Sequence, residues 1–216
     1  LTDDYLVAPG AGDDGDIGDT LDNTMTIARV SNGAITEGAS VRVTYHYVDA
    51  AYYEAVRVAD FEVVKDLYGE PFSPATGAIT SPLSMAAKVA FENGARELIL
   101  LATEGTSSVT AADLAAAYPK ILNLHSVGVV VPVTAGITSD GDLGTAATDL
   151  VNHCVNASAD GFYRIGVIGI DTGYTTGTPQ AVAESANSSR VMVAWPNKLL
   201  YYNAFTGTTV EVGGQY

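Results

Sequence analysis

The sequence predicts an α/β fold with a mostly parallel central sheet flanked by helices, and a smaller β-rich N-terminal lobe. From about residue 56 onward, short apolar runs alternate with stretches of helical periodicity. Before that point, apolar and polar residues alternate at a period of two, as in a half-buried strand. We therefore expect an acidic loop plus a β-rich lobe over residues 1–55 and an α/β core domain over residues 56–216.

The first 22 residues are strongly acidic. They contain seven aspartates, several glycines and no Lys or Arg. Self-repulsion and the glycine content predict a solvated loop. The spacing of Asp14, Asp16 and Asp19 lacks the Gly at the sixth position and the Glu at the twelfth position of a standard calcium loop, so a solvated loop is favoured over a weak calcium site.

Two stretches of the N-terminal lobe have β character, Thr26–Ser31 and Ser40–Val48. In the second stretch, valines and tyrosines alternate with polar residues. This pattern predicts a pair of strands with one buried face. Asn32 and Gly33 signal a turn between the two stretches.

The first two helices are predicted by their caps as well as by their periodicity. One covers Asp60–Tyr68 and stops at Gly69. The other has Ser81 as its N-cap and Pro82 at its first helical position, and it ends at Gly94. Because capping signals and apolar spacing agree, we expect both helices to form.

An apolar run and a third helix follow. The run covers Leu98–Ala102. Thr110 opens the helix with Asp113 three residues further on, which is the spacing of a capping box. The helix is expected to run through Leu122, and Pro119 is able to kink it.

The remaining strands lack polar alternation and are separated by helices, a pattern that predicts a parallel sheet covered on both sides. A hairpin is expected to follow the sheet. The predicted elements are the strand Val127–Val133, the helix Leu143–Ala157, the strand Tyr163–Ile170, a helix starting at Thr178 and Pro179, the strand Arg190–Ala194, and a hairpin of Leu199–Tyr202 and Thr208–Val212.

Composition excludes several classes of protein. Apolar residues make up 47% of the chain and charged residues 16%, which excludes a disordered chain, and no run of about 18 apolar residues is present. The net charge of -15 argues against nucleic acid as a partner. A single cysteine, Cys154, excludes an intrachain disulfide framework and a zinc site of four thiolates.

Two patterns match the letters of chemical motifs and lack their context. Gly10–Gly15 (GAGDDG) matches the dinucleotide fingerprint, but no full strand precedes it and no helical pattern follows. The triplet Asp171–Gly173 (DTG) resembles that of aspartic proteases, whose chemistry needs a second carboxylate, and no second triplet is present. An Asp that follows a buried strand is expected to cap the next loop.

Other reactive side chains form no convincing set. Ser188–Ser189, His153 and Asp171 have the residue types of a catalytic triad, but no G-x-S-x-G elbow is present. His125, His153 and Cys154 are metal-ligating types, yet adjacent helical residues point about 100° apart. We therefore predict no catalytic, cofactor-binding or metal-binding residue, and no enzyme.

An ordered set of segments carries a resemblance to a known family. A "D-F … G" segment is followed by a helix that ends in Phe-Glu-Asn-Gly, with a strand directly after it, and later by core strands and an "S-S-R … P" segment. Over roughly residues 41–212 this order resembles the tail sheath proteins of contractile-tailed bacteriophages. The segments are Val58–Gly69 (VADFEVVKDLYG), Ser81–Ala102 (SPLSMAAKVAFENGARELILLA), Val127–Val133 (VGVVVPV), Phe162–Asp171 (FYRIGVIGID) and Asn187–Pro196 (NSSRVMVAWP).

The resemblance implies a structural subunit that assembles around the tail tube and contracts to drive the tube through the host envelope. The implied partners are other copies of the chain in a helical sheath, the tail tube protein and baseplate components, with no nucleic acid and no membrane. The implied location is the virion tail, after synthesis in the host cytoplasm. Family members carry terminal arms that link neighbours by strand addition, so we expect this chain to be a central fragment without these arms and to be monomeric in isolation.

Two alternatives of other classes stay open. One is an α/β enzyme or ligand-binding domain with its site at the strand carboxyl ends near Val133–Gly136 and Asp171, where open α/β sheets bind ligands. The other is a surface binding module that uses the tyrosine-rich β lobe, because Tyr is favoured at interfaces. The same tyrosines fit the half-buried faces of the lobe equally well. They are Tyr45, Tyr47, Tyr52 and Tyr53, with Tyr201 and Tyr202 near the other end of the chain.

Overall fold

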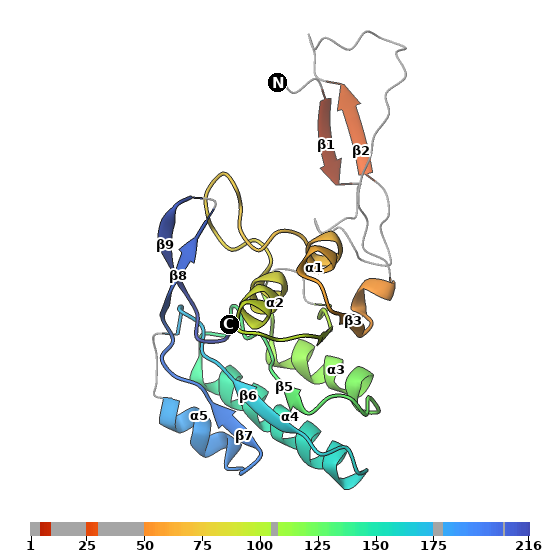
Figure 1. Ribbon diagram of the computed structural model, residues 1–216, viewed down its shortest axis with the longest axis vertical. Coiled ribbons are helices and arrows are strands. Elements are labelled where there is room, and N and C mark those ends of the chain that lie inside the picture. The colour runs from red at the N-terminus through yellow and green to blue at the C-terminus, as the bar shows by residue number, and fades with distance from the viewer. Residues whose placement is uncertain (1–4, 10–24, 30–49, 105–107, 175–178, 205) are drawn as a thin grey trace. The chain divides into compact units, whose positions relative to one another are not determined.

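The computed structural model describes residues 5–9, 25–29, 50–104, 108–174, 179–204 and 206–216 (Figure 1). The chain divides into two compact units, Leu1–Tyr52 and Tyr53–Tyr216. The second unit contains all the helices longer than one turn among the described residues, together with a parallel sheet. None of these helices is long and apolar enough to cross a membrane.

The described strands of the first unit form one antiparallel pair. Strand β1 (Tyr5–Pro9) pairs with β2 (Met25–Arg29), with Tyr5 opposite Arg29. The prediction that residues 1–22 form only a loop is therefore wrong for β1, whose short apolar run lies next to the aspartates. The expected partner of β2, Ser40–Val48, lies outside the described residues.

Helices α1 (Phe61–Tyr68) and α2 (Pro82–Glu92) confirm the predicted caps. The Asp60 side chain accepts a hydrogen bond from the amide of Glu62, and Gly69 ends α1 with a φ of 82°. The Ser81 hydroxyl accepts from the amide of Ser84, with Pro82 at the first helical position. These side chains satisfy backbone groups that a helix end leaves unpaired.

A short antiparallel pair lies beside these helices. Strand β3 (Val56–Val58) follows a 3-10 turn, η1 (Ala50–Tyr53), and pairs with β4 (Leu98–Leu100). The sequence predicted the apolar run that contains β4 but not β3, because three residues are too few to show a period. In α3 (Ala111–Ile121), Thr110 and Asp113 form the expected capping box.

The three-stranded parallel sheet confirms the predicted α/β fold. Its strands lie in the order β5–β6–β7, and the crossovers contain α4 and α5. Helix α4 begins three residues before the predicted start, because Ser139 caps it and the Asp-Gly-Asp segment that follows is helical. The elements are β5 (Val129–Val130), α4 (Asp140–Ala159), β6 (Ile165–Ile168), α5 (Pro179–Ala186) and β7 (Val191–Val193).

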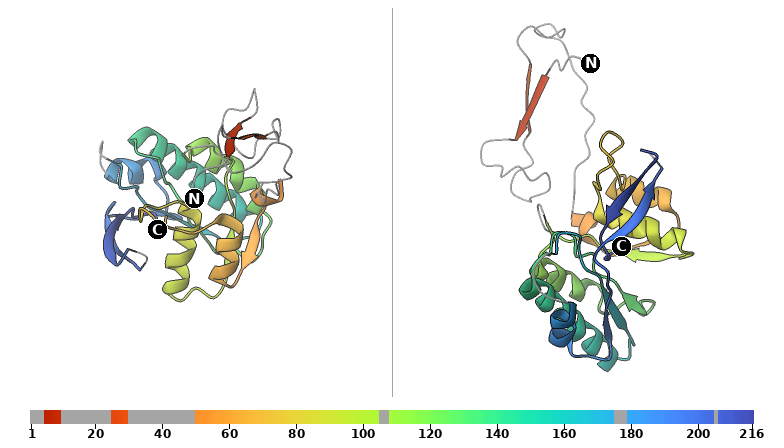
Figure 2. Two further views of the ribbon diagram at one scale, coloured as in Figure 1. Left: turned by 90° about the horizontal axis from the view of Figure 1, so that it is seen from above. Right: turned by 90° about the vertical axis from the view of Figure 1, so that its left-hand side faces the viewer.

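The helices pack on one face of this sheet. Val130, Ile168 and Val191 point into the core that α3, α4 and α5 cover, and α4 lies behind β6 in Figure 1. The side view in Figure 2 places these helices on the same side of the strands. Parallel strands in sequential order, joined by right-handed crossovers, have their connecting helices on the same face.

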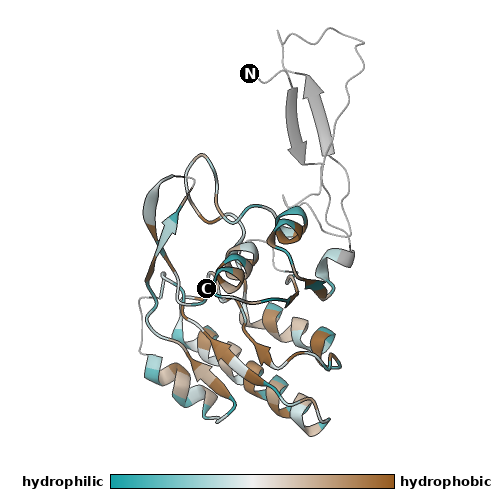
Figure 3. Ribbon diagram, viewed as in Figure 1, coloured by the Kyte–Doolittle hydropathy of each residue, from teal (hydrophilic) through white to brown (hydrophobic). Residues whose placement is uncertain are grey.

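The opposite face of the sheet is exposed, so the prediction of a sheet covered on both sides is wrong. Val129, Val131, Ile165 and Met192 point away from the helices and are 43–59% exposed. The paired positions Val129 with Ile165, and Val167 with Met192, place these side chains on one surface. The continuous apolar runs of these strands are thus explained by two apolar faces, of which the described residues of the second unit cover one. Figure 3 shows the hydrophobic character of these strands.

The predicted C-terminal hairpin is confirmed as β8 (Leu199–Asn203) and β9 (Thr208–Val212). Its inner face packs on the core around Phe72 and Met85. The Tyr201 ring stacks on Phe72 with centroids 5.8 Å apart, and its hydroxyl donates to Glu92 (2.7 Å). The alternate residues of β8 point outward and are exposed.

Candidate functional site

Asp171 lies just beyond the carboxyl end of β6, where the alternative active site was expected. Its carboxylate accepts hydrogen bonds from the amide of Gly173 (2.7 Å), the amide of Gly136 (3.3 Å) and the side-chain amide of Gln215 (2.9 Å). These donors belong to the loop after β6, the loop after β5 and the C-terminal segment. Asp171 therefore holds three segments together, as expected of an Asp that caps a loop.

The C-terminal segment fills the place beside Asp171. The amide of Gly214 donates to the carbonyl of Ile170 (2.9 Å). A Cβ on Gly169 would overlap the Gly214 carbonyl oxygen, so the two backbones are in direct contact. The Thr134 hydroxyl donates to the Gly169 carbonyl (2.9 Å). The chain's own backbone thus lies against the segment that follows the carboxyl end of β6, the end at which open α/β sheets bind ligands.

His153 is buried on α4 and faces a cation. Nη1 of Arg164 lies 2.8 Å from its Nε2, and the Tyr118 ring stacks on it with centroids 4.9 Å apart. Because a guanidinium can only donate, Nε2 is the acceptor and the proton of the neutral imidazole is on Nδ1. Burial, and secondarily the charge of Arg164, lower the pKa of His153 to about 4. His153 is therefore neutral at neutral pH.

Arg164 connects the start of β6 with the end of α3. Its Nη2 donates to the carbonyl oxygens of Leu122 (2.9 Å) and Leu124 (2.8 Å). Carbonyls at a helix C-terminus carry a partial negative charge, which favours a cation there. Burial lowers the pKa of Arg164. From the sequence we expected no buried role for Arg164, although a lone Arg in an apolar strand segment is a signal for a buried cation.

The residues considered as a catalytic triad or as metal ligands do not lie together in one site. His153 contacts Arg164 and Tyr118, whereas Asp171 bonds to loops at the other end of β6. The Ser188 hydroxyl accepts from the amide of Arg190, and the His125 ring packs edge-on against Phe162. Across the part of the chain that the structure describes, no three His, Cys, Asp or Glu side chains form a group that could hold a metal ion.

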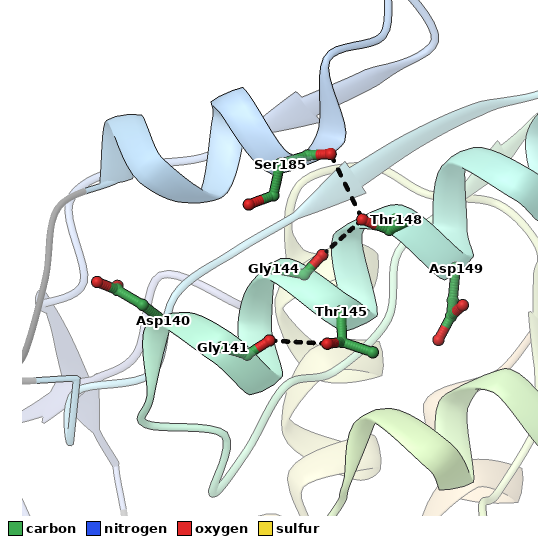
Figure 4. Close-up of a pocket in the computed structure, with 7 residues that line it drawn as sticks. All are labelled: Asp140, Gly141, Gly144, Thr145, Thr148, Asp149 and Ser185. Atoms are coloured by element: carbon green, nitrogen blue, oxygen red, sulfur yellow. Dashed lines mark hydrogen bonds between the residues drawn. The ribbon is translucent and has the colours of Figure 1, made fainter.

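A shallow groove of about 290 Å³ lies between α4 and α5 (Figure 4). The Thr145 and Thr148 hydroxyls that line it donate to carbonyls of the helices. These groups are therefore engaged with the backbone rather than directed toward a ligand. The groove is lined by Asp140, Gly141, Gly144, Thr145, Thr148, Asp149 and Ser185.

Exposed apolar surface is the most distinctive functional feature of the second unit. It includes the uncovered face of the parallel sheet and the outer face of the hairpin, where Leu200 and Tyr202 are 77% and 63% exposed. Clustered exposed apolar side chains mark interaction sites. These surfaces are therefore candidates for contact with other proteins.

Comparison with known proteins confirms the resemblance predicted from the sequence. The chain is 30% identical to the tail sheath protein of Mycobacterium phage Bxz1 over 221 residues. The match covers 99% of this chain and 36% of that protein, so the chain spans little more than a third of the relative's length. No family model matches the chain.

Proposed function

We propose that this chain is a structural subunit of a contractile phage tail sheath, which assembles around the tail tube and contracts to drive the tube through the host envelope. The observation that carries the proposal is the 30% identity to a tail sheath protein over 99% of the chain. In this role the chain is not an enzyme, and its location is the virion tail after synthesis in the host cytoplasm.

The contacts within the second unit support a subunit that moves as a rigid body. Asp171 ties two loops and the C-terminal segment together, and Arg164 ties β6 to the end of α3. Packed cores of this kind transmit force with little deformation. Rearrangement during contraction then falls on the contacts between subunits.

The proposed partners are other copies of the chain, the tail tube protein and baseplate components. The net charge of -15 keeps particles soluble and restricts attraction to specific patches. Some cations are already engaged within the subunit, since Arg57 pairs with Glu97 and Lys65 with Glu62. We expect the isolated chain to be monomeric.

An active site at Asp171 has less support than the sheath role. Its carboxylate accepts hydrogen bonds from Gly136, Gly173 and Gln215, and the C-terminal segment is bonded to Ile170 directly beside it.

Immunogold electron microscopy tests the proposal. Antibodies raised against this chain are applied to particles of the phage that encodes it, with pre-immune serum as the control. We expect gold along the outside of the tail shaft, in a zone that shortens when the tail contracts. Labelling confined to the capsid, or no labelling of intact tails, would contradict the proposal.

A further inference from the structure

The uncovered face of the parallel sheet, defined by Val129, Val131, Ile165, Val167 and Met192, is here named the open face. Its residues are apolar, and four of the five are exposed. Strands of a parallel sheet are normally buried on both faces. The strand order explains why the described part of the second unit covers only one of them, since both crossover helices lie on the other side. The open face is therefore a candidate surface for a partner.

The outer face of the β8–β9 hairpin is a second apolar surface of the same unit. Leu200 and Tyr202 point outward from β8, opposite Glu211 and Thr209 of β9. Of their two cross-strand partners, only Glu211 is charged. Its carboxylate forms an ion pair with Nζ of Lys198 at 3.0 Å. The hairpin thus presents two large apolar side chains beside a carboxylate that already has an ion-pair partner.

The symmetry of a helical assembly determines which apolar patches of neighbouring subunits can contact each other. Packing the open face against the same face of a second copy gives a two-fold contact, which closes after two subunits. A helical array needs two different patches that meet head to tail. The open face and the outer face of the hairpin are different patches on one subunit, so they can meet this requirement together.

We propose that the open face binds the outer face of the β8–β9 hairpin of a second copy of this chain. The proposal rests on the proposed sheath function, because the head-to-tail requirement comes from helical assembly. In the contact, Leu200 and Tyr202 of one copy pack on Val129, Ile165 and Met192 of the next. Both surfaces are twisted β structure, which packs face to face at about 10 Å with its strands nearly aligned.

The size of the patch fits a lattice contact. A stable dimer buries about 800 Å² on each partner. Five apolar side chains, none of them more than 59% exposed, supply less than this. A single contact is therefore weak, in agreement with a monomer at low concentration, and many repeated contacts add up in an assembled array.

Disulfide trapping tests the contact with the whole chain. The Met192→Cys and Leu200→Cys proteins are purified separately, mixed at high concentration, oxidised, and separated on a non-reducing gel. Cys154 is buried, so wild-type chain serves as the blank. We expect several-fold more crosslinked dimer in the mixture than in either variant alone, and a ladder of larger species from the double variant.

Matched controls identify the surface. Val155 on α4 is 47% exposed and lies on the helical side of the unit, so Val155→Cys mixed with Leu200→Cys should give only background. Leu67→Cys on α1 tests another exposed apolar residue as the partner of Met192→Cys. Crosslinking of Met192→Cys with itself, preference for Leu67→Cys, or a yield equal to the Val155→Cys control would each overturn the proposal.

The failure of this contact is distinguishable from the failure of the sheath function. If antibodies label the tail shaft but Met192→Cys and Leu200→Cys do not crosslink, the chain is a sheath subunit with other contacts. If the crosslink forms but intact tails are not labelled, the chain self-associates in another assembly. Each result bears on one proposal alone.

Discussion

The guanidinium of Arg164 donates to Nε2 of His153 over 2.8 Å in the core between α3, α4 and β6. The two residues are 11 positions apart, His153 on α4 and Arg164 directly before β6. This hydrogen bond requires a neutral imidazole, because a protonated His153 would have no acceptor on Nε2 and would repel the guanidinium. His153 is therefore a proton-binding group of this core that folding keeps unprotonated.

Folding stability should fall when the pH is lowered from about 6.5 to about 4. The pKa of His153 is about 4 in the folded chain, below its ordinary value of 6.5, so the unfolded chain takes up the proton first. The stabilisation is fully present above pH 6.5 and is lost as the pH falls through the folded pKa. Its size is on the order of 3 kcal/mol. Urea unfolding at a series of pH values measures it.

The variant His153→Gln is the control, because many carboxylates also titrate in acid. Gln offers an acceptor for Arg164 but binds no proton in this range. The difference in unfolding free energy between wild type and the variant should narrow as the pH falls. Parallel curves between pH 7 and pH 4 would show that His153 does not titrate in this way.

Replacing Arg164 should destabilise the second unit strongly. Arg164→Met leaves the Leu122 and Leu124 carbonyls and the His153 nitrogen without their donors, at a cost of about 2–4 kcal/mol. Arg57→Met is the matched control, since Arg57 pairs with Glu97 at the surface and its loss should cost less than about 1 kcal/mol. Equal unfolding free energies for the two variants would contradict the role assigned to Arg164.

Local signals made part of this fold predictable. Asp60, Ser81 and Thr110 cap their helices within three residues of their own positions, so the sequence contains both partners of each hydrogen bond. The hairpin of β8 and β9 is local in the same sense. The pairing of β1 with β2 is not local, because 15 residues separate the two strands and no two-residue turn marks their register.

Non-local contacts limited what the sequence could reveal of the site. The loop-capping role of Asp171 was predictable from its place after a strand, but its bond to Gln215 joins positions 44 residues apart. The open face was missed because an apolar strand has the same sequence whether a helix covers its second face or solvent does. Only the order of the strands, which the sequence does not state, distinguishes the two cases.

Replacing Asp171 should loosen the C-terminal segment. Asp171→Ala removes the acceptor for Gly136, Gly173 and Gln215, and we expect a loss of about 1–3 kcal/mol. Gln215→Ala removes only one of these bonds and should cost less. Hydrogen exchange at the Gly214 amide reports the segment directly, because this amide donates to Ile170. Unchanged protection of the Gly214 amide in Asp171→Ala would show that Asp171 does not hold the C-terminal segment in place.

A methyl group at Gly169 should displace the same segment by steric overlap alone. The Cβ of Gly169→Ala would collide with the Gly214 carbonyl oxygen and the Cα of Gln215, which are backbone atoms with little freedom to move. Overpacking of this kind costs about 1–3 kcal/mol or more.

Gly128→Ala is the control, because Gly128 is also in the sheet region and an added Cβ there meets no atom within 4 Å. This substitution should leave the free energy of unfolding unchanged or slightly raised. We expect urea unfolding to separate the two variants and the Gly214 amide to lose protection only in Gly169→Ala. Equal protection of this amide in both variants would mean that the C-terminal segment does not lie against the backbone of Gly169 in solution.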